Sequence, residues 1–456
     1  MPTIITWFKG GLRMFLIGNG RLVTRNNENQ IIENGCVAIT GNKILEVGTT
    51  EELRAKYSSA TRFINAKGKL IMPGFINTHM HYYSTFARGI SNDSPPATKF
   101  SEILKGLWWR LDKVLTLEDV YYSAVGPMID QIKCGVTTAV DHHASPFAIE
   151  GSLFKLADAA KDIGIRSNLC YETSDRDGEK IALEGIKENI GFIKHCNKIN
   201  DDMLKGMFGI HASMTLSDKT LDKCLSEMEG LNSGFHVHTA EGIEDVEDSK
   251  AKYGKGVVER WHAKGVLTPK TIAVHCVHIS EKEMDMIKEK DAIVVNNPES
   301  NMGNAVGTSP VLKMYEKGIL LGMGTDGYTA DITESYKVGN IVQKLVNSDP
   351  NVAWGEMPNM LFNNNPKIIN RFIEGTVGVI EPGALADVIV VDYNPPTPIN
   401  SGNINGHLLF GVSGRHVETT VINGKVLMEN RELVSIDEDK LMARSRELAA
   451  EVWKRF

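Results

Sequence analysis

The sequence predicts an α/β protein that combines a (β/α)8 barrel with a small composite β-sandwich domain built from both chain ends. Short apolar strands alternate with amphipathic helical stretches between residues 73 and 375, which is typical of βαβ units around a parallel sheet. Such units fill about 300 residues, the size of a barrel of this kind. Strand-rich segments flank the region on both sides. A doubly wound open sheet is the alternative arrangement.

The composite domain is predicted from two strand-rich segments, residues 14–72 and 376–434. "FLIGNGRLVT" and "GCVAITGNKILEVG" carry β-branched residues between Gly and Asn turns, and similar patterns return only near the other end of the chain. Neither segment has enough strands for a stable sheet alone, so we expect the two to pair. "TTEELRAKY" interrupts the first segment and predicts a short helix with a threonine cap.

The two ends of the chain carry different signals. Residues 435–456 predict a helix with a Ser435/Glu438 capping box. Its apolar face is expected to pack on the barrel or on a neighbouring subunit, and it comprises Leu441, Leu448 and Val452. Residues 1–13 precede a second methionine and lack the basic and apolar regions of a signal peptide. We interpret them as a mis-assigned start or non-native residues.

Composition and charge exclude several classes of partner. The formal net charge of −7 argues against a nucleic-acid surface, which needs clustered Lys and Arg. No apolar run approaches the roughly 18 residues of a membrane span. The six cysteines are scattered without a C-x-x-C pair, which fits reduced thiols in the cytosol. We therefore expect a cytoplasmic protein that binds neither nucleic acid nor membrane.

The eight strand candidates of the barrel are, in order, "LIMPGFINTHMH", "TTAVDHH", "RSNLCYE", "MFGIHAS", "GFHVHTAE", "TIAVHCVH", "AIVVNNP" and "ILLGMGTDG". Nearly every one ends in a residue able to bind a metal or move a proton. In chain order these are His79 and His81; Asp141, His142 and His143; Glu172; His211; His238 with Glu241; His275; and Asp326. Barrel strand ends converge on one face, where active sites lie. Core packing does not explain such a repeated pattern.

The first of these strand ends indicates a metal site. Residues i and i+2 of a strand point the same way, so His79 and His81 present two imidazoles to the interior. His238 and Asp326 complete a set of three nitrogens and one oxygen, which favours zinc or iron over magnesium or calcium. We therefore expect one divalent metal ion, with zinc preferred and iron as the alternative.

Four segments, "PGFINTHMH", "HVHTAE", "AVHCVH" and "GTDG", resemble in order the signature sites of the amidohydrolase superfamily, in its mononuclear aminohydrolase branch. The resemblance spans residues 73 to 327 and implies that His79, His81, His238 and Asp326 bind the metal. "VDHHASP", "CYETSDRDG" and "GIHASMTLSD" are similar to the SsnA-type aminohydrolases, a subgroup. The binuclear branch uses a carbamylated lysine on the fourth strand, and "MFGIHAS" offers none.

The resemblance implies a metal-dependent hydrolase acting on carbon–nitrogen bonds other than peptide bonds. An aminohydrolase of this kind converts the C–NH2 of a small purine-like or pterin-like heterocycle to a carbonyl and releases ammonia. Asp326 would accept a proton from water, His275 would orient that water, and Glu241 would protonate the ring and then the amine. The alternative is the same chemistry with another leaving group, as in a chlorohydrolase or a cyclic amide hydrolase. A non-catalytic binding protein is disfavoured, because the full set of chemical groups is present.

The substrate itself is not fixed by the resemblance, because "HASMT" and "GTDGYTADITE" depart from related purine deaminases at positions that shape the pocket. The candidate substrate contacts are His211, His143, Glu172 and Tyr82. Glu172 and Arg176 either contact substrate or form a solvated turn of charges, and Tyr82, Tyr83, Trp108 and Trp109 either line the pocket or pack between helices. His236 is expected to support the site by a hydrogen bond. Only one of His142 and His143 can face inward. A homodimer or higher homo-oligomer stays open by analogy.

Overall fold

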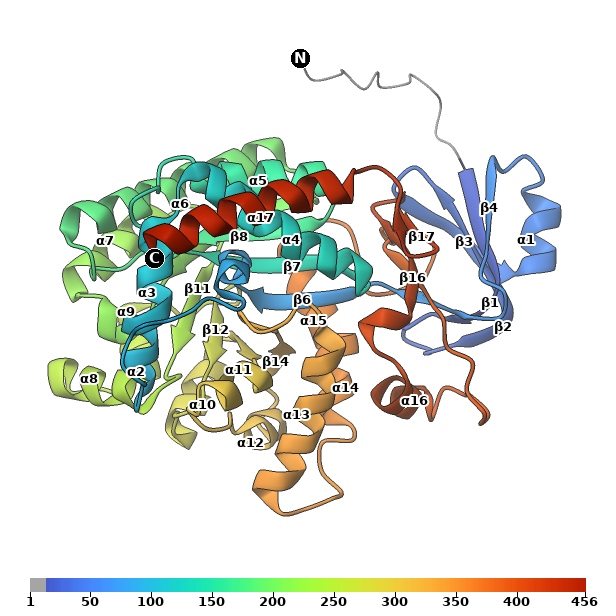
Figure 1. The fold of residues 1–456 in the computed structure, drawn as a ribbon. Coiled ribbons are helices and arrows are strands. Elements are labelled where there is room, and N and C mark those ends of the chain that lie inside the picture. The colour runs from blue at the N-terminus through green and yellow to red at the C-terminus, as the bar shows by residue number, and fades with distance from the viewer. Residues whose placement is uncertain (1–13) are drawn as a thin grey trace.

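A computed structural model describes residues 14–456, and the interpretation of residues 1–13 lies outside the described part of the chain. A nine-stranded sheet stands beside two parallel sheets of four and five strands, which together carry the eight predicted barrel positions. Figure 1 shows the nine-stranded sheet at one end of the molecule and the helix-covered parallel strands filling the rest. The predicted fold class is confirmed.

The composite sheet draws its strands from both chain ends, as predicted. Its strands are β1 (Met14–Val23), β2 (Ile31–Thr40), β3 (Lys43–Thr49), β4 (Arg62–Asn65), β5 (Leu70–Pro73), β15 (Val388–Val391), β16 (Val417–Ile422), β17 (Lys425–Glu429) and β18 (Glu432–Leu433). The two ends join where β5 and β15 pair antiparallel, with Leu70 opposite Val391. Strands of both ends contribute to one buried apolar cluster that includes Ile17, Ile71 and Val390. Burial of this shared cluster stabilises the pairing between strands of the two chain ends.

The barrel strands run parallel around a closed ring. They are β6 (Phe75–Met80), β7 (Val136–His143), β8 (Arg166–Tyr171), β9 (Leu204–Gly206), β10 (Phe208–Ile210), β11 (Phe235–Thr239), β12 (Ile272–His275), β13 (Ile293–Asn296) and β14 (Leu320–Met323). β10 lies within the fourth predicted strand, "MFGIHAS", whereas β9 precedes it and was not predicted. Parallel bridges from Thr173 to Ile210 and from Met80 to Asp326 close the ring between the two sheets. The ring brings all predicted strand ends to one face.

The first predicted barrel strand is divided at Gly74, which corrects its assignment to the barrel alone. β5 belongs to the composite sheet and β6 to the barrel. A Cβ atom at position 74 would lie 2.1 Å from Thr137 Cγ2, so only glycine allows the chain to pass this close to β7. The chain therefore enters the barrel directly from the sheet that precedes it.

Helices cover the barrel strands and close its functional end. They are α4 (Leu117–Lys133), α5 (Ser152–Ile163), α6 (Glu179–Ile199), α7 (Asp218–Met228), α8 (Ile243–Tyr253), α9 (Val257–Lys264), α10 (Glu281–Glu289), α11 (Pro298–Gly303), α12 (Val311–Glu316), α13 (Ile332–Asn347), α14 (Glu356–Asn359) and α15 (Asn365–Ile369). Between β6 and β7, α2 (Phe100–Ile103) and α3 (Trp109–Leu111) flank a π-helical segment. Within residues 14–456, none of the helices has the length and apolarity needed to cross a bilayer.

Three further helices belong to the chain ends: α1 (Thr50–Lys56), α16 (Ile404–Gly411) and α17 (Glu438–Arg455). α1 has the predicted threonine cap, in which Thr49 and Glu52 bond reciprocally. The last helix packs on α4 of the barrel, beside which Figure 1 shows it. It buries Leu448 and Val452. Its predicted Ser435/Glu438 capping box is wrong. The helix begins at Glu438 itself, and the side chain of Asp437 accepts from the backbone N–H of Lys440.

A buried ion pair connects the barrel to the composite domain. Arg166 of β8 pairs with Asp387, which precedes β15, and their side chains are 2% and 1% exposed. Replacing Asp387 with Ala is expected to lower the free energy of unfolding by about 3–5 kcal/mol, because Arg166 would keep a buried charge without its partner. Thermal unfolding measures the loss. Asp392→Ala is the matched control, since this half-exposed acid lies 3.5 Å from Lys69 and is worth at most about 1 kcal/mol. Equal shifts for both variants would contradict the assignment.

Candidate active site

The strand ends bring four predicted metal ligands together. Ring nitrogens of His79, His81 and His238 lie within 4.8 Å of one another, and so do the side-chain donor atoms of His79, His275 and Asp326. His81 Nε2 lies 3.2 Å from His238 Nε2 and 3.2 Å from Asp326 Oδ1. Residues more than 240 positions apart in the sequence therefore meet at one point. This geometry is what a single cation site requires.

The hydrogen bonds of the three imidazoles leave one nitrogen of each ring facing the same point. His79 Nδ1 lies 2.8 Å from His236 Nε2, while His79 Nε2 is buried without a hydrogen-bond partner among residues 14–456. Burial, reinforced by the neighbouring imidazoles, holds the pKa of His79 well below its ordinary value, so this ring is neutral. His81 Nδ1 and His238 Nδ1 donate to the backbone carbonyls of His142 and His211 at 2.5 and 3.0 Å. In all three rings Nδ1 is bonded elsewhere, which leaves Nε2 facing the shared point, where contact with Asp326 outweighs burial and raises the pKa of His81 to about 9.

Asp326 supplies the oxygen of the set. The Ser300 hydroxyl donates to Asp326 Oδ2 at 2.7 Å, and the Gly327 N–H donates to Oδ1 at 2.7 Å. Burial alone raises the pKa of Asp326, but contact with His81 outweighs it and keeps the carboxylate ionised. Asp326 adopts a left-handed φ of 56°, which costs energy in a residue with a side chain. A strained backbone at this position is consistent with a functional constraint.

Glu241 and His275 stand beside Asp326. His275 Nε2 lies 3.4 Å from Glu241 Oε2 and 3.6 Å from Asp326 Oδ2, and its Nδ1 lies 2.8 Å from Asn301 Oδ1. Asn304 Nδ2 donates to Glu241 Oε1 at 3.3 Å. Burial, together with the Asp326 carboxylate, raises the pKa of Glu241 well above its ordinary value. The pair of carboxyl groups, Glu241 and Asp326, therefore offers one protonated acid and one ionised base in the same site.

These groups adjoin a cavity whose empty space, counted together with the solvent at its mouth, is about 620 Å³. Its polar wall includes Glu241 and Asp326, and aromatic side chains form much of the remainder. The lining residues are His81, Tyr83, Ser84, Phe100, Leu104, Trp108, Trp109, Glu172, His211, His238, Glu241, Ser300, Asn304, Asp326, Gly327 and Tyr328. A flat heterocycle has both the apolar surface and the polar edge that such a cavity complements.

The structure divides the four candidate substrate contacts. His211 and Glu172 line the cavity, whereas Tyr82 and His143 do not. Tyr82 is fully buried with its hydroxyl 3.4 Å from Ser167 Oγ, and its neighbour Tyr83 faces the cavity in its place. The His143 ring turns away, with Nε2 2.9 Å from Ser145 Oγ. The structure therefore places Tyr82 and His143, two of the predicted substrate contacts, outside the cavity wall.

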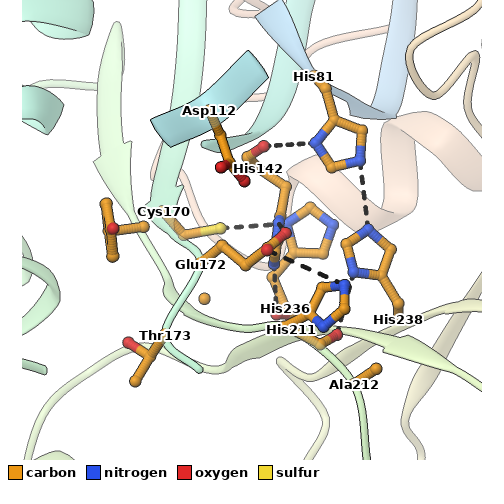
Figure 2. A network of polar contacts seen from close by, with 12 residues as sticks. His81, Asp112, His142, Cys170, Glu172, Thr173, His211, Ala212, His236 and His238 are labelled. Carbon is orange, nitrogen blue, oxygen red and sulfur yellow. Dashed lines mark hydrogen bonds and ion pairs between the residues drawn. The ribbon is translucent and has the colours of Figure 1, made fainter. Parts of the chain in front are cut away.

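His142 is the member of the strand-end histidine pair that faces the site. His142 Nδ1 lies 3.3 Å from Glu172 Oε2, and the His142 ring centre is 4.6 Å from that of His238. Consecutive residues of a strand point to opposite sides, so this orientation excludes His143 from the same space. Figure 2 shows His142 together with His81, His236 and His238. Trp108 and Trp109, which the sequence left undecided, belong to the cavity wall.

Sequence reasoning missed the residues that orient the catalytic groups from α11. Ser300, Asn301 and Asn304 contact Asp326, His275 and Glu241, respectively. The seventh predicted strand is the one without a ligand-type residue at its end, so no strand-end pattern indicated the residues that follow it. The available signal was the spacing of polar residues 300, 301 and 304 in "NNPESNMGN", because residues three and four apart lie on one face of a helix.

Comparison with known proteins identifies relatives along nearly the whole chain. The model of the amidohydrolase family matches residues 70–427, and that of the bacterial imidazolonepropionase-like composite domain matches residues 35–57. The chain is 30% identical to the 5-methylthioadenosine/S-adenosylhomocysteine deaminase of Pelotomaculum thermopropionicum, over 95% of this chain and 98% of that protein. It is also 30% identical to the 5'-deoxyadenosine deaminase of Methanosarcina acetivorans, over 96% and 98%.

Among solved structures, an adenosine deaminase from Xanthomonas campestris with bound zinc superposes with a TM-score of 0.85. The two sequences are 22% identical, and the match covers 96% of this chain and 98% of the other. This similarity extends over both the barrel and the composite domain. It establishes that the two proteins share the same overall fold.

Proposed function

We propose that this chain, which belongs to the amidohydrolase family, is a hydrolytic deaminase of a small purine-like heterocycle. It converts a ring C–NH2 to a carbonyl and releases ammonia. The observation that carries this proposal is the meeting of Glu241, His275 and Asp326 with three converging imidazoles at one point beside the cavity, which Glu241 and Asp326 line. Two relatives at 30% identity are named as deaminases of adenosine derivatives, which supports a purine-like ring.

His79, His81, His238 and Asp326 would hold one divalent cation. The three imidazole nitrogens and one carboxylate oxygen suit zinc, and iron is the alternative. A cation in this position supplies Lewis acidity, which lowers the pKa of water toward neutrality. The three rings are positioned for it by their Nδ1 contacts with His236 and with two backbone carbonyls.

The proton transfers are assigned to this chain's own carboxyl groups. Asp326, the ionised member of the pair, accepts a proton from the attacking water. His275, oriented by Asn301, positions the oxygen of that water. Glu241, the protonated member, donates to the ring nitrogen next to the reacting carbon. Glu241, now ionised, takes the proton of the added hydroxyl and delivers it to the exocyclic nitrogen, so the carbonyl forms as the C–N bond breaks and ammonia leaves. The water proton held by Asp326 then restores Glu241. The aromatic walls exclude bulk water from these steps.

An ammonia-release panel tests the proposed function. Metal-loaded protein is incubated with adenine, adenosine, 5'-deoxyadenosine, 5-methylthioadenosine, guanine and pterin, and ammonia is measured together with the carbonyl product. We expect at least one purine-type compound to yield the two products in equal amounts. Chelation should abolish the reaction, and added zinc should restore it. Hydrolysis of a chlorinated ring or a cyclic amide, with no ammonia from any aminated ring, would contradict the proposal and favour the other leaving groups.

A further inference from the structure

A second carboxylate, Glu172, faces the same cavity as Glu241. It comes directly after β8, whereas Glu241 follows β11, so the two acids enter from different strands. Glu172 is 6% exposed and forms part of the cavity wall beside His211. The proton transfers assigned above do not use it. Figure 2 shows Glu172 next to His142 and His211.

The surroundings of Glu172 keep it ionised without neutralising it fully. His142 Nδ1 lies 3.3 Å from Glu172 Oε2. Arg176, the nearest guanidinium, is paired with buried Asp112, and its Nη2 stays 4.0 Å from Glu172 Oε1. Burial raises the pKa of Glu172, but His211, His142 and Arg176 outweigh it and hold the pKa well below its ordinary value. A carboxylate at this position therefore carries its charge into the cavity.

One oxygen of Glu172 is left for a ligand. The nitrogens that face Oε1, His211 Nε2 and Arg176 Nη2, lie 3.9 and 4.0 Å away, beyond hydrogen-bonding distance. An ionised carboxylate accepts hydrogen bonds and donates none. A desolvated charge of this kind is stabilised only when donors reach it. The nearby cavity wall includes the aromatic ring of Trp109, which adds apolar surface on this side.

We propose that Glu172 selects substrates by accepting a hydrogen bond from a donor other than the reacting amine. The donor is either a ring N–H or a hydroxyl of an attached sugar, both of which donate a hydrogen bond to a carboxylate. This inference rests on the proposed function for the identity of the cavity as the substrate site. A ligand with only acceptors at this position leaves Oε1 of the carboxylate without a donor, so the site disfavours it.

Calorimetric binding to two metal-loaded full-length variants tests the role of Glu172. Glu241→Gln serves as the reference, because binding is then measured without turnover, and Glu241→Gln/Glu172→Gln is the test protein. Adenine is compared with 9-methyladenine, which lacks the ring N–H, and adenosine with 2',3',5'-trideoxyadenosine, which lacks all three sugar hydroxyls. We expect removal of the donor in at least one pair to weaken binding to the reference about 10- to 100-fold. In the test protein the same removal should change Kd less than about 3-fold.

The result also identifies the donor. A penalty in the adenine pair assigns the ring N–H, and a penalty in the adenosine pair assigns the sugar hydroxyls. Equal penalties in both variants, no penalty in either pair, or no binding of any of the four compounds would overturn the proposal. Because binding is read without ammonia, a failed ammonia panel refutes the proposed function by a separate measurement.

Two controls separate selection from structural support. Glu179→Gln changes an exposed acid at the start of α6 that pairs with Lys219, and it should leave every affinity unchanged. Metal analysis covers the remaining alternative, since His142, Glu172 and His238 also lie close enough to hold an ion. Glu172→Gln is expected to retain its single ion. Loss of that ion would show that Glu172 is a ligand and would overturn its role in selection.

Discussion

Glu241→Gln is expected to lower the turnover number about 10²- to 10⁴-fold while the protein keeps its metal ion. Gln has the size and shape of Glu and can still contact Asn304, but it has no acidic proton to deliver. The raised pKa of Glu241 is the reason for expecting so large an effect, because burial and Asp326 favour its protonated form. Steady-state ammonia release and metal analysis of the same preparation give the two quantities.

The matched control for this variant is Glu247→Gln. Glu247 lies on α8, in the same stretch of chain, and its side chain is exposed. It should retain normal turnover. A Glu241→Gln variant with near-normal turnover would refute the role of Glu241 as proton carrier. Loss of metal in that variant would instead show that Glu241 supports the cation site.

His79→Ala is expected to reduce the metal content from about one ion per chain to near zero, and with it all hydrolytic activity. The Nε2 atom of His79 is a buried nitrogen without a hydrogen-bond partner among residues 14–456, and the variant removes this predicted ligand. His81→Ala should have the same effect. Elemental analysis after dialysis measures metal content, and the thermal midpoint should no longer rise when metal is added.

His143→Gln is the control for the two ligand variants. His143 is an equally buried histidine on the neighbouring strand, and its contact is with Ser145. The His143→Gln variant should keep its metal ion. Retention of the ion by His79→Ala, or its loss in His143→Gln, would mean that the ligands have been assigned incorrectly.

The barrel and the ligand cluster could be predicted because both follow from local patterns. A strand fixes the direction of residues i and i+2, and parallel strands with helical crossovers bring their ends to one face. His79, His81, His238 and Asp326 needed no knowledge of side-chain packing to be placed together. The join between the chain ends was predictable for a similar reason, since neither group of strands forms a stable sheet alone.

Positions outside regular strands could not be predicted in this way. Tyr82 and Tyr83 lie in a 3₁₀ turn, Tyr82–Ala87, where the exit path of the chain decides which ring faces the cavity. The contacts of Ser300 and Asn304 depend on how α11 is placed against two other strand ends. The start of α17 depends on which of several polar residues meets a free backbone N–H, and Asp437 takes that role in place of Ser435.

Anomalous diffraction from crystals of the metal-loaded protein, recorded at the zinc absorption edge, tests the central claim most directly. The claim predicts one strong peak about 2.0–2.2 Å from the Nε2 atoms of His79, His81 and His238 and from a carboxylate oxygen of Asp326. A peak bound elsewhere, or no peak in crystals whose protein retains stoichiometric zinc in solution, would contradict it.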